Sequence, residues 1–289
     1  MNDIAIQEVD TITASLTISE QVNLLEAEML QLPQVECPVR NIFSPGLWIR
    51  EVTIPAGTFS IGHEQKMVHW NVLLKGRVTI VLEDGSKAEL VAPLTYVGRP
   101  GRKVGYVHED MVWQNVYPTD ETDIEKLEAM FINKSHAWDN KQETQDNLLS
   151  LVNYVDNEDY HALLREYGIT ESEARQQSEN TDDQIPLPYG AYKISVSDSA
   201  IEGKGLFSTA PIEAGEVIAP ARINGKRTIA GRYTNHSPVP NAKMIMNDMG
   251  DIYLVAIKAI DGCKGGSLGE EITTNYRDTE KLHSKEIKE

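Results

Sequence analysis

Cysteine is nearly absent from this chain of 289 residues, which contains only Cys37 and Cys263. Neither residue has a second cysteine or a histidine at a spacing typical of metal ligands, so we expect neither a structural zinc site nor a disulfide framework. The sequence also lacks an apolar run of the roughly 20 residues needed to cross a bilayer, which predicts a protein without a membrane segment.

The beginning of the sequence lacks the basic stretch that precedes the apolar core of a secretory signal. Residues 1–10 carry acidic side chains instead, which argues against such a signal. We therefore expect a cytoplasmic protein. The length of 289 residues is enough for two domains of ordinary size.

Basic residues are also scarce, since 27 Lys and Arg face 44 Asp and Glu and give a net charge of −17. The excess of acid lies in residues 1–189, which hold 14 basic and 31 acidic residues, whereas residues 190–289 hold 13 of each. An acidic surface repels phosphate backbones, which disfavours direct nucleic-acid binding, and it attracts a basic protein segment. The alternative is that the charge only keeps the protein soluble.

Local patterns predict a mainly β fold with a helical connector, divided into four segments. The segments are an N-terminal helical extension, a β-barrel, an acidic helical connector with a linker, and a second domain, over residues 1–46, 47–117, 118–189 and 190–289. In the extension, Ser19 is expected to cap a helix that Pro33 ends. In the connector, Gly168 is expected to interrupt the helical periodicity, and the segment SENTDDQIPLPYG is typical of a linker.

The barrel is predicted from the runs LWIREVTI, HWNVLL, RVTIVL, AELVA, LTYVG and MVWQNVY, which PAG, KG, EDG and RPG turns separate. Short strands with such turns are typical of an antiparallel barrel or jelly roll. The segment resembles the cupins, in which interior His and Glu side chains often hold a divalent metal. The resemblance makes His63, His69 and His108 candidate metal ligands, since imidazoles suit several transition metals. The alternative is a metal-free barrel that forms a homo-oligomer or docks a partner.

Three separated clusters in residues 190–289 carry the chemistry that we expect. They read GKGLF, RYTNHSPVPN and GEEITTNY, over residues 203–207, 232–241 and 269–276. Taken singly each signal is weak, because glycine turns and capped polar loops are common. In this order they resemble the SET-domain methyltransferases, which have a GxG turn, an RxxNHSxxPN block and a GEE block that ends in tyrosine. The resemblance covers about the last 90 residues and implies small curved sheets with a knot-like crossing.

The SET resemblance implies S-adenosyl-L-methionine as cofactor and a protein lysine as substrate. Its expected cofactor-binding residues are Lys204, Gly205, Leu206, Arg232, Asn235 and His236, and its expected catalytic residue is Tyr276. These residue types suit the task, because glycine lets the main chain approach a nucleoside and asparagine offers both a donor and an acceptor. Methyl transfer to a neutral amine depends mostly on positioning.

The sequence departs from the family's pattern at Pro238, Thr274 and Asn275, where the family commonly has cysteine, an aromatic residue and aspartate. The rate of turnover and the number of methyl groups therefore stay open. His236 follows Phe207 by only 29 positions, so the insert that usually helps to form the peptide groove is short. We expect the acidic connector or the barrel to supply the missing wall, which favours a substrate with a basic segment.

The pairing of a cupin-like segment with a short SET-like segment is similar to proteins encoded by tailed bacteriophages. It implies a host or phage protein as substrate and the host cytoplasm as location. Two alternatives stay open. One is a scaffold without turnover, associated with a virion, and the other is a metal-dependent activity on a small molecule in the barrel.

Overall fold

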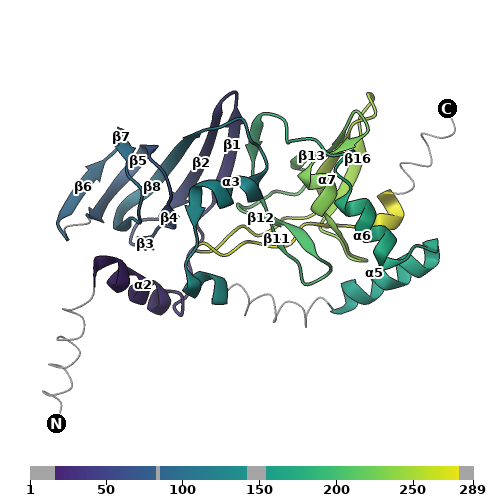
Figure 1. Cartoon of the computed structure of the whole chain (residues 1–289), viewed down its shortest axis with the longest axis horizontal. Helices are drawn as coiled ribbons and strands as arrows, with labels where there is room; N and C mark the ends of the chain where they lie inside the picture. Colours follow the sequence, from purple (N-terminus) through teal and green to yellow (C-terminus); the bar gives the residue numbers. More distant parts are fainter. Residues whose placement is uncertain (1–16, 83–84, 142–153, 280–289) are drawn as a thin grey trace, which may run out of the picture.

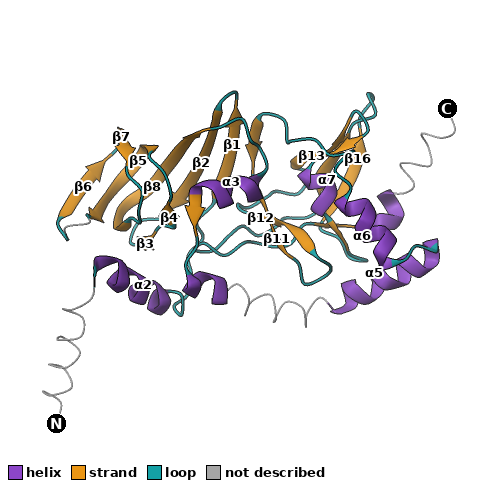
Figure 2. Cartoon of the chain, viewed as in Figure 1, coloured by secondary structure: helices purple, strands orange, loops and turns teal. Residues whose placement is uncertain are grey.

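The computed structural model describes residues 17–82, 85–141 and 154–279. The first sixteen residues, on which the prediction about a secretory signal rests, lie outside this part of the chain. The described chain is mainly β, as expected, with one large sheet, several small sheets and helices beside them (Figure 2). No described helix is both long and apolar enough to cross a bilayer.

Helix α2 (Ile18–Met29) is the first described element and lies beside the large sheet (Figure 1). Its cap is Thr17, whose Oγ1 accepts a hydrogen bond from the Glu20 amide at 3.3 Å, while the Glu20 carboxylate accepts the Thr17 amide at 2.7 Å. The expectation of Ser19 as cap is wrong, because a capping box needs a glutamate three residues after the cap. Arg102 attaches the helix to the sheet through Glu26, at 2.5 Å.

Eight antiparallel strands form the large sheet, in the order β10-β1-β2-β8-β5-β6, with β3 beside β8 and β7 beside β5. Their bounds are β1 (Val39–Ser44), β2 (Leu47–Ile54), β3 (Phe59–Ile61), β5 (His69–Val81), β6 (Lys87–Val91), β7 (Leu94–Gly98), β8 (Val104–Pro118) and β10 (Gly190–Tyr192). The expected closed barrel is not formed, since within the described residues β10 and β6 stay at opposite edges without pairing. The inner face of the large sheet is covered by helix α2 and by the C-terminal third. In a closed barrel, strands of the same sheet would cover it.

The KG turn expected within residues 69–81 is not a turn. Strand β5 runs through it and pairs with β8, with register shifts between Leu73 and Val78. Gly76 has φ +90°, and a Cβ there would lie 2.6 Å from the carbonyl oxygen of Asp110. Glycine therefore permits a β-bulge, which bends two long strands together without separating them.

The connector contains the helices that the sequence predicts. They are α3 (Ile124–Phe131), α5 (Tyr154–Tyr167) and α6 (Glu171–Glu179), and the short strands β4 (Glu64–Gln65) and β9 (Ile132–Asn133) pair beside α3. Gly168 follows α5 with φ +66°, as a helix-ending glycine does. The segment expected to be a linker is packed, because Leu187 is buried and Asp183 pairs with Arg227 at 2.7 Å.

The C-terminal third consists of short elements in three small sheets. Its elements are β11 (Ile194–Asp198), β12 (Lys204–Ser208), β13 (Val217–Ile223), β14 (Lys226–Arg227), α7 (Ile229–Tyr233), β15 (Asn235–His236), β16 (Ala242–Met246), β17 (Ile252–Ala256) and β18 (Thr273–Thr274). Strand β11 pairs with β12, β13 lies between β14 and β17, β16 follows β17, and β15 pairs in parallel with β18.

The N-terminal and C-terminal parts share one hydrophobic core. Trp48 is fully buried and stacks on Tyr117 with ring centroids 4.9 Å apart. The same buried cluster includes Ile194 and Leu206 of the C-terminal third. Strand β10 also extends the large sheet by pairing with β1, and it follows directly after the boundary expected near residue 190. The C-terminal third is therefore built onto the sheet, and both parts depend on the same packing.

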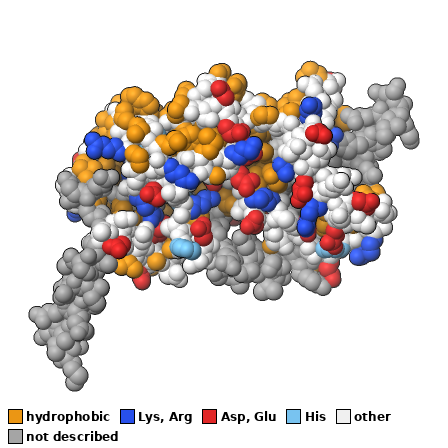
Figure 3. Space-filling model, viewed as in Figure 1, with side chains coloured by type: hydrophobic (Ala, Val, Ile, Leu, Met, Phe, Trp, Pro, Cys, Tyr) orange, Lys and Arg blue, Asp and Glu red, His pale blue; other side chains and the backbone are white. Residues whose placement is uncertain are grey.

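The outer face of the large sheet carries apolar side chains in one row. Ile42, Ile49, Val116, Trp70 and Val97 lie opposite one another on neighbouring strands. The Trp70 side chain is 52% exposed, and Figure 3 shows hydrophobic side chains gathered over the sheet. The homo-oligomer expected through this domain stays a prediction, and this row is the apolar surface that the sheet offers for it.

We expect Trp48→Ala to lower the free energy of unfolding by about 3 to 5 kcal/mol, because it leaves a large cavity in the shared core. Trp70→Ala is the matched control on the outer face, with an expected loss below about 1 kcal/mol. Urea unfolding followed by circular dichroism measures both changes. Hydrogen exchange should show faster opening in both parts of the Trp48→Ala chain, and a loss of protection confined to the sheet would contradict a shared core.

Candidate functional site

The structure brings the three clusters of the C-terminal third together. Strand β15 of the second cluster pairs in parallel with β18 of the third, and Asn235 lies opposite Thr273. The first cluster reaches the same place, because Phe207 forms an antiparallel bridge with Glu271. Segments that are far apart in sequence therefore form one site, which we call the motif junction.

The side chain of Asn235 connects the clusters at the motif junction. Its Nδ2 has two hydrogens and three acceptors within reach, which are Glu271 Oε1 at 2.8 Å and the carbonyl oxygens of Glu202 and Lys204, each at 3.2 Å. Glu271 also accepts a hydrogen bond from Ser199 Oγ at 2.8 Å. Sequence reasoning assigned no role to Glu271 or Ser199, since their contact with Asn235 depends on long-range pairing.

Strand β12 forms one wall of the motif junction. A Cβ at Gly205 would collide with the carboxylate of Glu271, so glycine is what lets this carboxylate approach the backbone. Leu206 is fully buried, and its carbonyl accepts a hydrogen bond from the backbone of the third cluster at 2.7 Å. The side chain of Lys204 turns away to Glu125 of α3, at 2.6 Å.

Tyr276 points its hydroxyl group at the second cluster and donates a hydrogen bond to the carbonyl oxygen of Thr234 at 2.8 Å. Burial raises the pKa of Tyr276 well above its ordinary value, and the neighbouring Tyr160 and Glu271 raise it further. The hydroxyl therefore keeps its proton at neutral pH. It acts here as a fixed hydrogen-bond donor, and its raised pKa argues against a role as a base.

His236 uses both ring nitrogens within the protein. Its Nδ1 accepts a hydrogen bond from the Tyr276 amide at 3.2 Å, which assigns the ring hydrogen to Nε2. Nε2 lies 2.8 Å from Asp159 Oδ2 and donates to it. The imidazole is almost fully buried, so it links the motif junction to helix α5 of the connector.

Helix α5 lies against the motif junction through several polar contacts. Asp159 also accepts from Arg277 at 2.8 Å, and Asp156 accepts from Ser237 Oγ at 2.8 Å. Asn157 donates to a backbone carbonyl in the turn before β12, at 2.6 Å. The hydrogen bond from Arg277, followed by that from His236, lowers the pKa of Asp159. The acidic connector thus forms one side of the motif junction.

Arg232 is the predicted cofactor residue that the structure does not bring to the motif junction. Its Nε donates to the carbonyl oxygen of Ser178 at 2.9 Å, and its Nη1 donates to Gln184 at 2.8 Å. Its guanidinium carbon lies 4.8 Å from the centre of the Tyr233 ring. These contacts give Arg232 a structural role, in which it attaches the last turn of α6 and the segment after it to the C-terminal third.

The three candidate metal ligands lie in different environments. His69 is buried on the inner face of the sheet, with Nδ1 2.9 Å from a backbone carbonyl. His108 lies 2.8 Å from Thr79 Oγ1, and Thr79 faces outward because its neighbours along β5 face the interior. His63 packs edge-on against Trp138. Within residues 17–82, 85–141 and 154–279, no three His, Cys, Asp or Glu side chains are placed to hold a metal ion.

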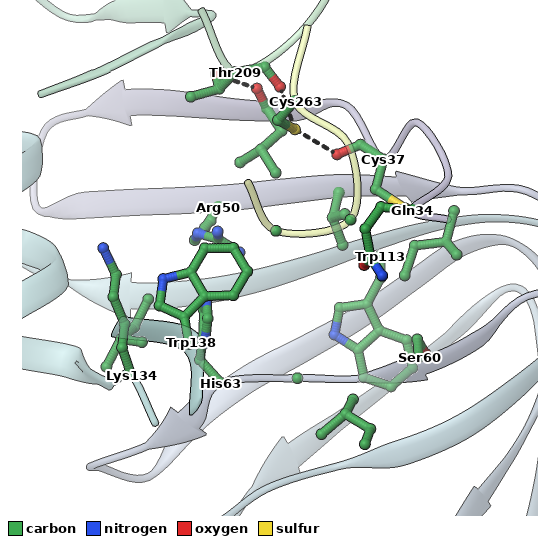
Figure 4. A pocket seen from close by; sticks show the side chains of 18 of the residues that line it. Gln34, Cys37, Arg50, Ser60, His63, Trp113, Lys134, Trp138, Thr209 and Cys263 are labelled. Carbon is green, nitrogen blue, oxygen red and sulfur yellow. Dashed lines mark hydrogen bonds between the residues drawn. The ribbon is translucent and has the colours of Figure 1, made fainter. Parts of the chain in front are cut away.

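A second site, which sequence reasoning missed, is a cavity of about 660 Å³ between the inner face of the large sheet, α2 and a C-terminal loop (Figure 4). Figure 4 shows Arg50, His63 and Lys134 around the indole of Trp138, with Trp113 across the cavity. The run LWIREVTI contained a signal, because strand alternation places an arginine on the same face as tryptophan, valine and isoleucine.

Comparisons with known proteins show no family for this chain. No family model matches the sequence, and no curated protein matches it. Three similar solved structures are an HTH_3 family transcriptional regulator from Vibrio cholerae, ectoine synthase from P. lautus, and a Cupin_2 domain of an XRE family transcriptional regulator from Enterobacter cloacae. Their identities to this chain are 18%, 15% and 15%, with TM-scores of 0.25, 0.26 and 0.24.

These similarities cover 32%, 30% and 29% of this chain, and 60%, 67% and 99% of the respective structures. This chain therefore spans less than two thirds of the Vibrio cholerae regulator. The neighbours include proteins named as cupin domains. Similarities of this size do not indicate a function for this chain.

We expect Asp159→Asn to destabilise the protein at neutral pH by about 1 kcal/mol, because it removes the charge that pairs with Arg277. The lowered pKa of the native carboxylate means that its stabilisation is present above the ordinary value of 3.8 and is lost as the pH falls through the lowered value. Urea unfolding at a series of pH values should therefore show the two proteins converging in acid. Asp182→Asn, at an exposed position, is the control, and a difference independent of pH would contradict the role of Asp159.

Proposed function

We propose that the C-terminal third is a SET-type methyltransferase that uses S-adenosyl-L-methionine to methylate a lysine side chain of another protein. The observation that carries the proposal is the motif junction, where the GKGLF, NHS and GEEITTNY segments meet although 27 and 31 residues separate each from the next. A chance match of three short motifs would have no reason to assemble at one place. The parallel pairing of β15 with β18 also supports the knot-like crossing that the resemblance implies.

The chemistry of the motif junction fits a cationic ligand. Oxygen acceptors gather within hydrogen-bond distance of Asn235 or Tyr276, namely the Glu271 carboxylate and the carbonyls of Glu202, Lys204 and Thr234. S-adenosyl-L-methionine would supply a methyl group on a positively charged sulfonium and would carry an ammonium group. The backbone of Lys204 and Gly205 with the Asn235 amide would hold it. Asn235 can release one of its three acceptors to do so.

Tyr276 serves in this proposal as a hydrogen-bond acceptor that positions the amine, because its own hydrogen is donated to Thr234. Its hydroxyl is protonated, and the hydrogen bond that it donates to the carbonyl of Thr234 fixes the orientation of the hydroxyl group. A lysine amine has an ordinary pKa of about 10.4 and must be neutral to react. Removal from water favours the neutral form. The Tyr276 oxygen can accept one N–H of the neutral amine and so direct the lone pair of the amine nitrogen toward the methyl group. Such positioning supplies most of the catalysis that methyl transfer needs.

The substrate in this proposal is a protein with a basic segment. Residues 1–189 carry 31 acidic and 14 basic residues, and α5 lies against the motif junction. Exposed carboxylates on α5 and α6 include Glu166 and Glu171, whose side chains are 54% and 58% exposed. Such a surface raises the local concentration of a positively charged segment. We also propose that the large sheet has a cupin-like fold. Its long, bent antiparallel strands support this proposal.

A second candidate is a SET-like scaffold that binds a partner without turnover. It is favoured by one observation, since Asn235 and Tyr276 already have hydrogen-bond partners inside the protein. The two candidates differ in one measurable property, which is whether the chain binds S-adenosyl-L-methionine and transfers its methyl group.

We expect calorimetric titration of the full chain to show binding of S-adenosyl-L-methionine that Asn235→Ala abolishes. Tyr276→Phe should keep that binding but lower transfer of a radiolabelled methyl group to polylysine by about 100-fold or more, because positioning of the amine is lost. Tyr253→Phe, at a partly buried tyrosine of β17, is the matched control and should leave both properties unchanged. Absence of binding and transfer in the wild-type chain favours the scaffold and rejects the enzyme.

A further inference from the structure

The cavity beneath the large sheet is walled by parts of the chain that are distant in sequence. Helix α2 and strands β2, β5 and β8 contribute residues, and so do β11 and the loop that contains Cys263. Gly266 of that loop packs on the ring of Trp138, where a Cβ would lie 2.6 Å from a ring carbon. The cavity therefore exists only when both parts of the chain are assembled, and its volume of about 660 Å³ is in the range of small-molecule sites.

Most of the cavity wall is apolar. Val52 and Ile54 of β2, Val78 of β5 and Met111 and Trp113 of β8 line it from the sheet. These residues lie in the second core cluster, either as members or packed against it. Such a surface suits the hydrocarbon body of a ligand, because burial of apolar area on both sides stabilises the complex.

Arg50 introduces a charge into this wall. It lies on β2 between Trp48 and Val52 along the interior face, and its Nε is buried without a hydrogen-bond partner. No carboxylate of the described residues lies within ion-pair distance of its guanidinium. Arg50 as a whole is only partly buried, but its buried NH group without a partner is unfavourable unless a ligand supplies an acceptor.

The neighbours of Arg50 do not balance its charge. Glu128 pairs with Lys134 at 2.9 Å. Burial opposes ionisation of Glu128, but the charges of Lys134 and then Arg50 lower its pKa overall. Two cations thus share one carboxylate at this end of the cavity. Lys103, elsewhere in the lining, is a further cation for which burial lowers the pKa to about 8.

His63 adds a polar group at the same end without adding charge. Burial, followed by the nearby charge of Arg50, lowers the pKa of His63 to about 4, so it is neutral at physiological pH. Its Nδ1 is buried and has no hydrogen-bond partner within the described residues. Its ring meets that of Trp138 edge-on, with centroids 5.1 Å apart. An unpartnered nitrogen and an unpartnered guanidinium NH therefore occur at the same end of the cavity.

We propose that this cavity binds a small organic anion, with its carboxylate at Arg50 and its apolar body against Val52, Ile54 and Trp113. A carboxylate would supply the missing negative charge and would accept the hydrogen of Arg50 Nε, in the planar geometry that guanidinium groups favour. The site is separate from the motif junction and does not depend on methyl transfer.

Calorimetry with the full-length protein tests the proposal with benzoate, 2-naphthoate, their neutral amides and inorganic phosphate. The carboxylates should bind about tenfold or more tightly than the amides, because only they carry the compensating charge. They should also bind more tightly than phosphate, which lacks the apolar body. Arg50→Met should remove this preference for the carboxylates. Arg40→Met is the matched control on the outer face, where Arg40 pairs with Glu51, and it should bind like the wild type.

Three results would overturn the proposal: no binding of either carboxylate, equal affinity for acids and amides, or unchanged affinity in Arg50→Met. Circular dichroism checks that Arg50→Met is folded. We expect that it is, since Glu128 keeps its ion pair with Lys134 at 2.9 Å in this variant. If that variant fails to fold, Val52→Trp provides the second test, because it fills the cavity and should abolish binding while it leaves Arg50 in place. Wild-type affinity in Val52→Trp would count against the site.

Discussion

The contact on which the rest of the structure depends is the aromatic group at the inner face of the large sheet. Trp48 stacks on Tyr117, and Phe131 of α3 packs on both rings at 5.9 and 4.7 Å. The indole of Trp48 donates to Asn41 Oδ1 at 3.0 Å, and Asn41 Nδ2 donates to the carbonyl of Ile194 at 3.2 Å. One buried side chain thus fixes the sheet, the connector and the start of the C-terminal third relative to one another. Because these hydrogen bonds are buried, loss of either partner would leave a costly unsatisfied group.

Strand β11 transmits this arrangement to both sites. It begins at Ile194, directly after the residues that extend the large sheet, and residues 195–198 line the cavity. The same strand pairs with β12, where Ser197 lies opposite Gly205 of the motif junction. The position of the GKG turn is therefore set by packing in the N-terminal part. The short C-terminal third can be stable in this way, since it contacts α5 through His236 and Ser237 and shares its core with the sheet.

The sequence was sufficient to predict what depends on local patterns. The strand runs from residue 47 onward follow from periodicity and the break at Gly168 follows from backbone conformation. The meeting of the three clusters was expected only from the resemblance to the SET family, and the structure brings them together. The closed barrel was wrong because strand order depends on long-range pairing, and β10 arrives from residue 190 to extend the sheet. The linker stays a prediction, and the sequence did not indicate that Leu187 is buried or that Asp183 pairs with Arg227. Glu271 was inside a recognised motif, but only its contact with Asn235 and Gly205 gives it a role.

Net charge is another property of the sequence that does not predict a buried site, because it describes the surface of the protein and not its interior. The N-terminal 189 residues are strongly acidic, yet the end of the cavity within them holds Arg50 and Lys134 against Glu128. Exposed acids act through water and salt, so their effect is diffuse and suits a basic protein segment. Charges at the wall of a cavity act at short range where water screens them less, so a guanidinium NH without a partner favours an anion there. The two parts of the molecule can therefore favour ligands of opposite charge without conflict, and only the position of each side chain in the fold shows which rule applies.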